Sequence, residues 1–435
     1  MEKSFKRINT IGNHIVGSFQ TVGSNSNSAI TAVSSGSRMY SKHQQDKSKD
    51  FFKPSESDLQ KLYKYQESQE KLNSVEPFHL TKVENKTLVL TLNRPKSLNV
   101  LNTHLFVNLN KKFQYFRDDP KLSLMIIKGN GRAYCAGGDI KELSIQTRDI
   151  GLLFPRYFFS KEYNLDYTAA TVNKPRVAFW DGIAMGGGLG ISVHSPYRIV
   201  TEKTVWAMPE VSIGLFPDVG ASYFLSRLKK DAIANYIAIT GKQLTGADCV
   251  EFGIATHFVK SEKLPELEKK LIALVHSQDV NVIESVINEF ASPPPPSPLL
   301  QDWSLISQCF SNRFNSIDEI MQALIDSKSQ WGKDIYDLIR KKSPTSVKIA
   351  FRQIKEGAAK SLEECFFMEF RLAIRSLSNN EFIEGVRSVV IDKDQKPKWD
   401  PPTLEETSDE YINHYFSKLP KDQEFPIGDD KIYMP

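Results

Sequence analysis

Two glycine-rich runs, about fifty residues apart, are the parts of this chain best suited to chemistry on an acyl group. They are Ala136-Gly137-Gly138-Asp139 and Met185-Gly186-Gly187-Gly188-Leu189-Gly190. Glycine lets the backbone adopt positive φ and approach a ligand closely. Two preorganised N–H groups aimed at one point stabilise the oxyanion of an acyl intermediate, and each contributes about 3 kcal/mol. Taken alone, either run could simply be a tight packing turn between a strand and a helix.

Three acidic residues accompany these runs: Glu162 lies between them, and Glu210 and Asp218 follow the second. A carboxylate beside an acyl ester can attack it as a nucleophile or activate water as a general base. Each acid also has an ordinary structural explanation. Glu210 could stabilise a helix N-terminus, Asp218 could be a turn residue, and Glu162 could be a solvated surface acid.

Four other reactive side chains are predicted to be structural. His194 and His257 lie on apolar segments and are interpreted as packing residues. Cys135 precedes the first glycine run among small residues, and its sequence neighbourhood offers no basic partner to activate a thiol. Asp139 is expected to hold its loop in place.

Alternating strand and helix patterns surround the two glycine runs. Phe78–Val83 and Thr87–Leu92 flank Glu84-Asn85-Lys86 and predict a hairpin. After it, strand pairs lead into helices repeatedly. Strands are predicted at Leu122–Lys128, Val177–Trp180, Arg198–Thr201 and Ala255–Val259, and helices start at Thr103, Gly186, Ala232, Ser343 and Ser361.

Composition excludes several functional classes. The 435 residues are 40% apolar and 25% charged, as in an ordinary globular protein. No uncharged apolar stretch of about eighteen residues is present, so no membrane partner is expected. A net charge of +4 without a basic face gives no sign of nucleic-acid binding. The four scattered cysteines predict neither a disulfide framework nor a metal site.

The N-terminus has the composition of a mitochondrial leader. Residues 1–45 contain nine serines and five Lys or Arg but a single acid, Glu2. Arg38-Met39-Tyr40-Ser41 resembles a processing site with cleavage after Tyr40. A disordered Ser/Asn tail with no targeting role is the alternative.

Six segments are predicted along the chain. The leader is followed by a polar, flexible lead-in, a strand-and-helix core, a loop rich in proline, a helical region and a surface tail. Their ranges are 1–40, 41–76, 77–290, 291–300, 301–400 and 401–435.

The motifs together resemble the crotonase (enoyl-CoA hydratase/isomerase) superfamily, and within it the branch of 3-hydroxyisobutyryl-CoA hydrolases, over roughly residues 77 to 420. The segment Met208–Gly220 and the C-terminal motifs are the most specific. The motifs are Asn93-Arg94-Pro95, Leu98-Asn99-Val100-Leu101, Gly131–Ile140, Gly182–Gly188, Ala207–Glu210, Gly214–Gly220, Glu384-Gly385-Val386-Arg387, Ile391–Gln395 and Pro397-Lys398-Trp399.

This resemblance implies an α/β (α+β) fold, a spiral of ββα repeats followed by C-terminal helices. It also implies an acyl-CoA substrate whose thioester oxygen lies between the backbone N–H groups of Gly138 and Gly187. The same oxyanion hole serves several reactions, so the fold alone does not decide the chemistry.

The acids indicate which reaction the resemblance favours. Hydratases of the family carry a catalytic glutamate where this chain has Gly190, and a second one that aligns with Glu210. The hydrolase branch keeps acids at Glu210 and Asp218, and both are present. The resemblance therefore assigns Glu210 as the reactive carboxylate, as nucleophile or as general base. Asp218 would orient the 3-hydroxyl or water and help protonate the thiolate, and Glu162 would contact the substrate.

The expected function is hydrolysis of 3-hydroxyisobutyryl-CoA in valine breakdown in the mitochondrial matrix, with no metal or other cofactor. Hydrolysis of another short 3-hydroxyacyl-CoA is one alternative. A second is a crotonase-fold subunit of the mitochondrial small ribosomal subunit, since 41–76 and the proline-rich insert at 292–298 leave room for such a role. Relatives of this kind are commonly trimers, so a homo-oligomer is a possible assembly.

Overall fold

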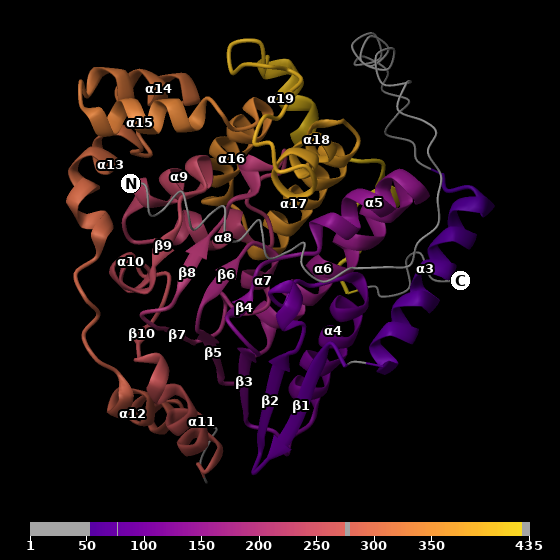
Figure 1. The fold of residues 1–435 in the computed structure, drawn as a ribbon, viewed down its shortest axis with the longest axis vertical. Coiled ribbons are helices and arrows are strands. Elements are labelled where there is room, and N and C mark those ends of the chain that lie inside the picture. The colour runs from indigo at the N-terminus through magenta and orange to yellow at the C-terminus, as the bar shows by residue number, and fades with distance from the viewer. Residues whose placement is uncertain (1–52, 76, 275–278, 429–435) are drawn as a thin grey trace.

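The strands form two sheets that wind through the centre of the molecule (Figure 1). The computed structural model describes residues 53–75, 77–274 and 279–428, so the expected leader over 1–40 lies outside the described residues. The strands are β1 (His79–Glu84), β2 (Thr87–Leu92), β3 (Leu124–Gly129), β4 (Ala133–Cys135), β5 (Arg176–Trp180), β6 (Ile183–Met185), β7 (Tyr197–Val200), β8 (Val205–Ala207), β9 (Leu244–Thr245) and β10 (His257–Phe258).

Each turn of the chain adds one strand to each sheet. The larger sheet has the order β1-β2-β3-β5-β7-β10, with the predicted β1–β2 hairpin antiparallel and the other pairs parallel. The smaller sheet has the order β4-β6-β8-β9, and its first three strands are parallel. Because β3, β5 and β7 are followed directly by β4, β6 and β8, the chain alternates between the sheets. This arrangement confirms the predicted spiral of ββα repeats.

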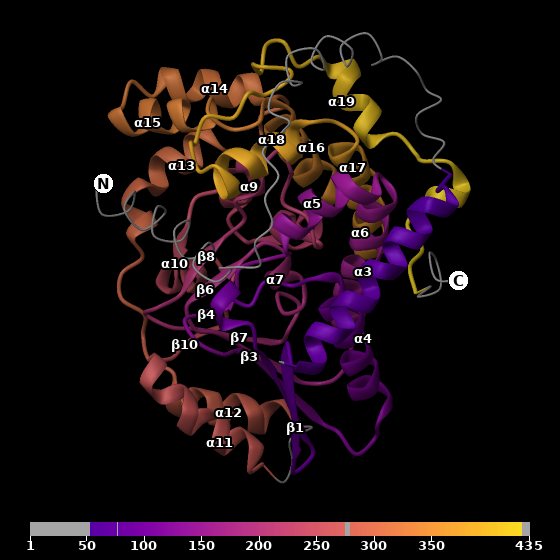
Figure 2. The ribbon, with the colours of Figure 1, turned by 45° about the vertical axis from the view of Figure 1, so that its right-hand side comes forward.

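Helices surround the sheets and cluster towards the C-terminal half (Figure 2). In both views α14 and α15 lie at one end of the molecule and α11 and α12 at the other. The helices are α3 (Glu56–Val75), α4 (Thr103–Asp118), α5 (Ile140–Ile150), α6 (Leu153–Thr171), α7 (Gly187–Gly190), α8 (Ala221–Phe224), α9 (Asp231–Thr240), α10 (Gly246–Glu251), α11 (Leu264–Ile272), α12 (Val280–Phe290), α13 (Trp303–Cys309), α14 (Ile317–Asp326), α15 (Gln330–Ile339), α16 (Pro344–Gly357), α17 (Leu362–Leu377), α18 (Glu381–Val386) and α19 (Asp409–Phe416).

Helix starts follow the capping rules closely. The Ser343 side chain accepts the Ser346 N–H at the start of α16, and Ser361 forms a capping box at the start of α17. Helix α4 begins at Thr103, as predicted, and its cap is the Asn102 side chain, which accepts the Leu105 N–H. The helix predicted to start at Gly186 is only the single turn α7, and the chain after Gly190 continues in turns.

The parallel strands are buried on both faces. Along β3, Met125 and Ile127 belong to the main core, whereas Leu124 and Ile126 pack with α11 and α12 on the opposite face. This explains the uninterrupted apolar run that predicted the strand, since sheets covered on both sides do not alternate polar and apolar residues.

Two segments differ from the prediction for polar ends of the chain. Within 41–76, residues 56–75 form helix α3, in which Leu62 is fully buried against the main core. Within 401–435, α19 and Phe425 pack into the same core. In both segments a few apolar residues spaced among many charges were enough to dock the chain.

Candidate active site

The two glycine runs meet in space. Gly137 and Gly186 both have positive φ, +105° and +49°, which turns the chain sharply at each run. A Cβ atom built on Gly137 would lie 3.5 Å from the backbone nitrogen of Gly187 and 3.7 Å from the Gly186 Cα. The positive φ at Gly137 and Gly186 favours glycine, and it brings the two turns into contact.

The N–H groups of Gly138 and Gly187 are free of protein acceptors among the described residues. Leu101 binds the residues on either side of Gly138: its N–H donates to the Gly137 carbonyl (2.9 Å), and its carbonyl accepts the Asp139 N–H (2.7 Å). Gly187 is the first residue of α7, where an N–H has no acceptor within the helix. The turns therefore present two unused donors near each other, as an oxyanion hole requires.

Glu162 reaches the two turns from helix α6. A Cβ atom on Gly138 would lie 3.3 Å from the Glu162 Oε1, and one on Gly187 would collide with the same oxygen. Glu162 is 3% exposed, so the alternative that it is a solvated surface acid does not hold. The structure thus brings three of the predicted site residues together.

Glu210 lies near the end of β8, the strand that pairs with β6 in the smaller sheet. It begins a short 3-10 turn, Glu210–Ser212, just after β8. A Cβ atom on Gly186 would lie 2.8 Å from the Glu210 Oε1. The carboxyl group therefore borders the second glycine turn, one residue before the Gly187 donor.

Asp218 is held by a tyrosine of helix α6. The Tyr163 hydroxyl donates a hydrogen bond of 2.9 Å to the Asp218 Oδ2. Burial raises the pKa of Asp218 to about 7, while this hydrogen bond opposes the increase. Asp218 can therefore both give and take a proton near neutral pH.

Burial and mutual repulsion raise the pKa values of the other two acids. The pKa of Glu162 is raised well above its usual range by burial, then by the charges of Asp218 and Glu210. The pKa of Glu210 is likewise raised by burial and by Asp218. Three interacting carboxyl groups in a dry site are typical of acid–base chemistry.

Three further residues belong to this region but were not predicted as site residues. Tyr163 holds Asp218, Asp166 lies one helical turn after Glu162, and Glu369 of α17 accepts the N–H groups of Gly220 (2.7 Å) and Ser222 (2.9 Å). The spacing of Glu162 and Asp166 places them on one face of a helix. That spacing was the one available signal, because the Glu369 contacts join residues about 150 positions apart.

The other reactive side chains have structural roles, as predicted for Cys135 and Asp139. The Cys135 thiol contacts the Asn99 carbonyl oxygen (3.0 Å), and burial raises its pKa to about 12. Asp139 forms an ion pair with Arg94 (3.3 Å) and caps α5.

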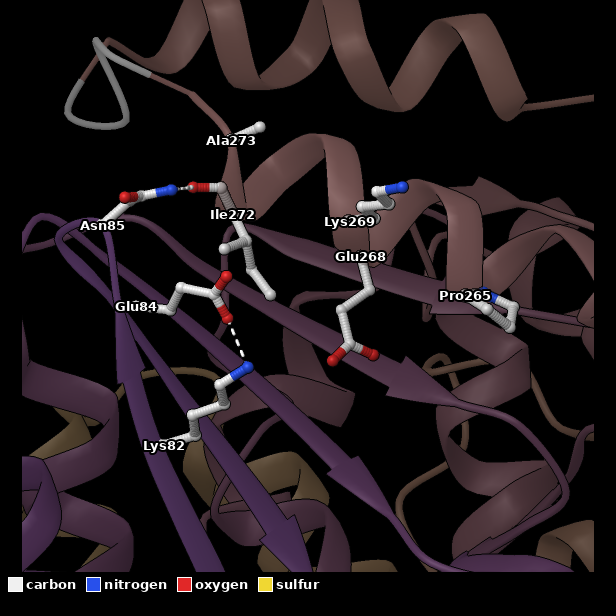
Figure 3. A pocket seen from close by; sticks show the side chains of 8 residues that line it. All are labelled: Lys82, Glu84, Asn85, Pro265, Glu268, Lys269, Ile272 and Ala273. Atoms are coloured by element: carbon white, nitrogen blue, oxygen red, sulfur yellow. Dashed lines mark hydrogen bonds and ion pairs between the residues drawn. The ribbon is translucent and has the colours of Figure 1, made fainter.

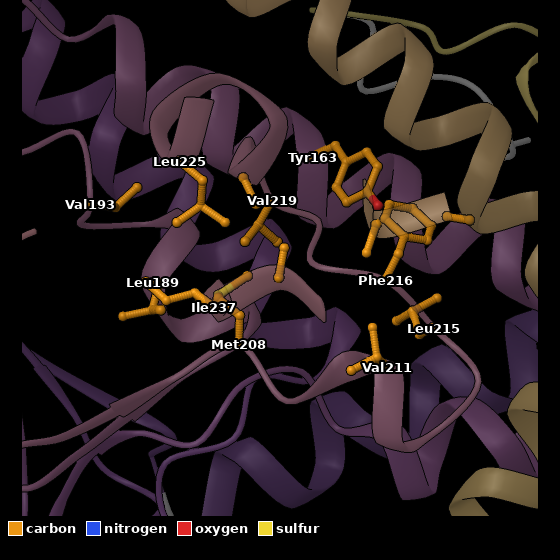
Figure 4. Packing of buried hydrophobic residues seen from close by; sticks show 14 of the residues in the cluster. Tyr163, Leu189, Val193, Met208, Val211, Leu215, Phe216, Val219, Leu225 and Ile237 are labelled. Carbon is orange, nitrogen blue, oxygen red and sulfur yellow. The ribbon is translucent and has the colours of Figure 1, made fainter. Parts of the chain in front are cut away.

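Buried side chains pack around the elements that carry the acids. Figure 4 shows Tyr163 of α6, Leu189 of α7 and Ile237 of α9 in one buried cluster with Met208 and Val211, which lie just after β8. Close packing of this kind fixes rotamers, so the carboxyl groups attached to the same elements are held in place.

A separate surface pocket lies between the β1–β2 hairpin and α11 (Figure 3). It has a volume of about 370 Å³, and none of its lining residues is a candidate site residue. Lys82 and Glu84, two residues apart on β1, form an ion pair at its wall (Figure 3).

The residues that the structure describes contain no group of three or more His, Cys, Asp or Glu arranged to bind a metal ion. Within the same part of the chain, no helix has the length and apolar character needed to cross a membrane.

Comparison with known proteins identifies the family. The sequence profile of the enoyl-CoA hydratase/isomerase family matches residues 87–416. The chain belongs to this family. Among solved structures, this family member is similar to a carnitinyl-CoA dehydratase from Mycobacterium thermoresistibile, with a TM-score of 0.74 and 31% identity, covering 82% of this chain and 100% of that one. It is also similar to an enoyl-CoA hydratase from Rhodobacter sphaeroides 2.4.1, with a TM-score of 0.73 and 27% identity, covering 80% and 100%.

Several relatives that are similar in sequence carry the name of one hydrolase. The 3-hydroxyisobutyryl-CoA hydrolase, mitochondrial, of Xenopus laevis is 44% identical over 336 residues, which cover 76% of this chain and 86% of the relative. The protein of the same name in Homo sapiens is 43% identical over 77% of this chain and 86% of its own length. The 3-hydroxyisobutyryl-CoA hydrolase 1 of Arabidopsis thaliana is 38% identical and covers 80% and 93%.

Proposed function

We propose that the protein hydrolyses 3-hydroxyisobutyryl-CoA to 3-hydroxyisobutyrate and free CoA. The observation that carries this proposal is the geometry of Glu210, which borders the glycine turn at Gly186, beside the free N–H groups of Gly187 and Gly138. The relatives named as hydrolases, at 38–44% identity over about three quarters of the chain, support the substrate.

Gly190 separates this reaction from hydration of a double bond. The family relatives that add water across a double bond use two carboxylates, whereas position 190 of this chain has no side chain. One reactive carboxylate next to an oxyanion hole is sufficient for acyl transfer to water.

The reaction can follow either of two balanced routes. In the first, a Glu210 oxygen attacks the thioester carbon, the C–S bond breaks and thiolate leaves, and water then hydrolyses the acyl-glutamyl anhydride. In the second, Glu210 takes a proton from water, the hydroxide adds to the carbon, and the same C–S bond breaks. In both, the N–H groups of Gly138 and Gly187 hold the oxyanion, and Asp218 supplies a proton to the departing sulfur.

We place the enzyme in the mitochondrial matrix, in valine breakdown. The Ser-rich, acid-poor composition of residues 1–45 and the mitochondrial relatives support this location. A purely ribosomal role is not proposed, because the relatives reported above are hydrolases and the carboxyl groups of Glu162, Glu210 and Asp218 are retained.

The direct test is thiol release from a panel of CoA esters with the purified protein. The panel pairs each short 3-hydroxyacyl ester with the matching ester that lacks the hydroxyl group. We expect 3-hydroxyisobutyryl-CoA to give the highest kcat/KM. The proposal is wrong if all these esters stay intact while an unsaturated ester gains water. A higher kcat/KM for 3-hydroxypropionyl-CoA would reassign the substrate within the same chemistry.

A further inference from the structure

Asp166 is a buried carboxyl group for which the proposed reaction has no use so far. It lies on α6, one helical turn after Glu162, and its side chain is 0% exposed. Neither of its oxygens has a hydrogen-bond partner among the described residues. Burying an ionised carboxylate without partners costs a great deal of free energy, so a carboxyl group in this position is expected to hold a proton.

The Asp166 carboxyl group occupies the space of a missing side chain on α7. A Cβ atom built on Gly190 would lie 2.5 Å from the Asp166 Cγ and 2.5 and 2.7 Å from its two oxygens. Gly187 and Gly190 are three residues apart on one side of α7, and Glu162 and Asp166 are four apart on one side of α6. The two acids of α6 therefore face the two glycines of α7.

The groups that face the two acids of α6 are acidic or neutral. Glu162 lies near the charges of Asp218 and of Glu210, which follows β8. Asp166 lies near the charges of Glu162 on its own helix, of Asp218 in the loop before α8 and of Glu369 on α17. From β4, Tyr134 and Cys135 face it as neutral groups.

Donors are distributed unevenly among these carboxyl groups. Glu369 accepts two backbone N–H groups and Asp218 accepts the Tyr163 hydroxyl. Among the described residues, both oxygens of Asp166 lack a hydrogen-bond partner, and no hydrogen bond counteracts the raised pKa of Glu162. Neighbouring carboxyl groups cannot all ionise unless hydrogen-bond donors stabilise their negative charges. The protons therefore remain on the carboxyl groups that accept no hydrogen bond.

The charge of Glu162 matters because of where its carboxyl group lies. Its Oε1 borders both Gly138 and Gly187, the two residues that offer free N–H groups. An ionised Glu162 would accept those N–H groups in place of the thioester oxygen, and it would repel the negative charge that develops there. A protonated Glu162 leaves the donors free and adds an O–H beside them.

We propose that Asp166 is a positioning residue that shares one proton with Glu162, so that Glu162 meets the thioester as a neutral acid. This inference rests on the proposed hydrolysis. It also explains why residue 190 is glycine, because any side chain there would displace the Asp166 carboxyl group.

The test compares the pH dependence of thiol release in the wild type and in Asp166→Asn, which keeps the size of the side chain. Removing the acidic neighbour lowers the pKa of Glu162. We expect the alkaline limb of kcat/KM to move by about one pH unit or more towards lower pH, because a close like-charged neighbour shifts a carboxyl pKa by that order. KM for 3-hydroxyisobutyryl-CoA on the acid side of the profile stays the same. An unmoved limb overturns the proposal.

Infrared spectroscopy separates this proposal from the hydrolase assignment. At neutral pH the wild type should show the carbonyl band of a protonated carboxyl group, and Asp166→Asn should weaken or shift it, with no substrate present. Absence of that band in the wild type overturns the shared proton even if thiol release is normal. Absence of thiol release from every ester with the band intact overturns the hydrolase assignment instead.

A double-mutant cycle tests the position of Asp166 even if Asp166→Asn folds poorly. Gly190→Ala should lower the unfolding temperature of the wild type more than that of an Asp166→Ala background, where the space is empty. Gly188→Ala is the matched control, because a Cβ there meets Cys135 and not Asp166, so its cost should be equal in both backgrounds. Equal costs of Gly190→Ala in the two backgrounds contradict the proposal.

Discussion

In the proposed reaction, Glu210 acts through its carboxyl group, which borders the glycine turn at Gly186. Glu210→Gln keeps the shape of the side chain but removes both the nucleophile and the base. We expect kcat for thiol release to fall by about a hundredfold or more, while calorimetric titration still detects binding of the CoA ester. Glu381→Gln is the control, since Glu381 is equally buried (3% exposed) and contacts Ser343 of a helix start. A variant of Glu210 with near-normal turnover would remove this residue from the mechanism.

The sequence predicted Glu162, Glu210 and Asp218 because each lies in or near a motif with a fixed place in the family. It could not predict Asp166 or Tyr163 in the same way. The contact of Asp166 with Gly190 exists only because α6 packs on α7, and the bond from Tyr163 to Asp218 joins residues 55 positions apart. Neither contact leaves a signal in local spacing, apart from the four-residue step from Glu162 to Asp166.

Helix α3 lies before the first residue of the family match, yet it is tied to the loop that carries the first glycine turn. The Tyr65 hydroxyl contacts the Thr103 hydroxyl (3.0 Å), and the Lys61 ammonium group donates to the Asp149 carbonyl of α5 (2.9 Å). Helix α5 is capped by Asp139, the last residue of the first glycine run. The extension therefore braces the helix that follows the proposed oxyanion turn.

Leu62→Ala tests whether α3 unfolds together with the rest of the protein. Leu62 is fully buried, so its truncation should lower the free energy of unfolding by about 2–5 kcal/mol. Leu72→Ala on the same helix is the matched control, because Leu72 is 56% exposed and its truncation should change little. Denaturant unfolding gives both values. Equal, small effects would mean that α3 is not part of the cooperative unit.

The segment after α19 reaches the site through aromatic rings. Phe425 stacks on Phe370 of α17 (centroids 5.3 Å apart) and meets Tyr163 edge-on (5.9 Å). The Asn164 amide also binds this segment, donating to the Pro426 carbonyl (3.1 Å) and accepting the Gly428 N–H (2.7 Å). The residues next to Glu162 on α6 are thus held by the C-terminal end of the described chain.

Phe425→Ala should therefore affect both stability and turnover. Loss of a buried ring costs about 3–5 kcal/mol of unfolding free energy, and kcat should fall because Tyr163 no longer holds Asp218 firmly. Tyr163→Phe removes only the hydroxyl that binds Asp218. In the double variant the two losses in kcat should not add, because they act through one contact. Additive losses in kcat, or an unchanged kcat in Phe425→Ala, would mean that the segment after α19 stabilises the fold but does not position Tyr163.

The sequence predicted the helices and strands whose positions are set by apolar periodicity and by capping residues. The hairpin, the buried strand at β3 and the helix starts at Ser343 and Ser361 were all found. The docked ends of the chain were not predicted, because α3 buries only a few residues among many charges. Such helices owe their stability to tertiary packing, which their own sequence does not reveal.

Across the whole molecule, the interior holds an unusual number of acids for an enzyme of modest net charge. Burial raises the pKa of Asp218 to about 7 and that of Glu369 to about 8. The same holds outside the site, where burial raises the pKa values of Glu142 and Glu381 to about 8. These groups bind protons in the folded state at pH values where the unfolded chain has released them.

Stability should therefore fall as the pH rises from about 4 to 8. Below about pH 4 the carboxyl groups are protonated in both states, and their contribution is fully present; it is lost as the pH passes through the raised values. Calorimetric unfolding temperatures between pH 4 and 9 measure this slope.

Glu142→Gln should make the pH slope of stability shallower, since Glu142 is one of its sources. Glu364→Gln is the contrasting control, because its hydrogen bonds with Ser361 lower the pKa of that exposed acid, and its effect should be confined to the acid side. A slope that Glu142→Gln leaves unchanged would mean that the buried acids ionise in the folded state.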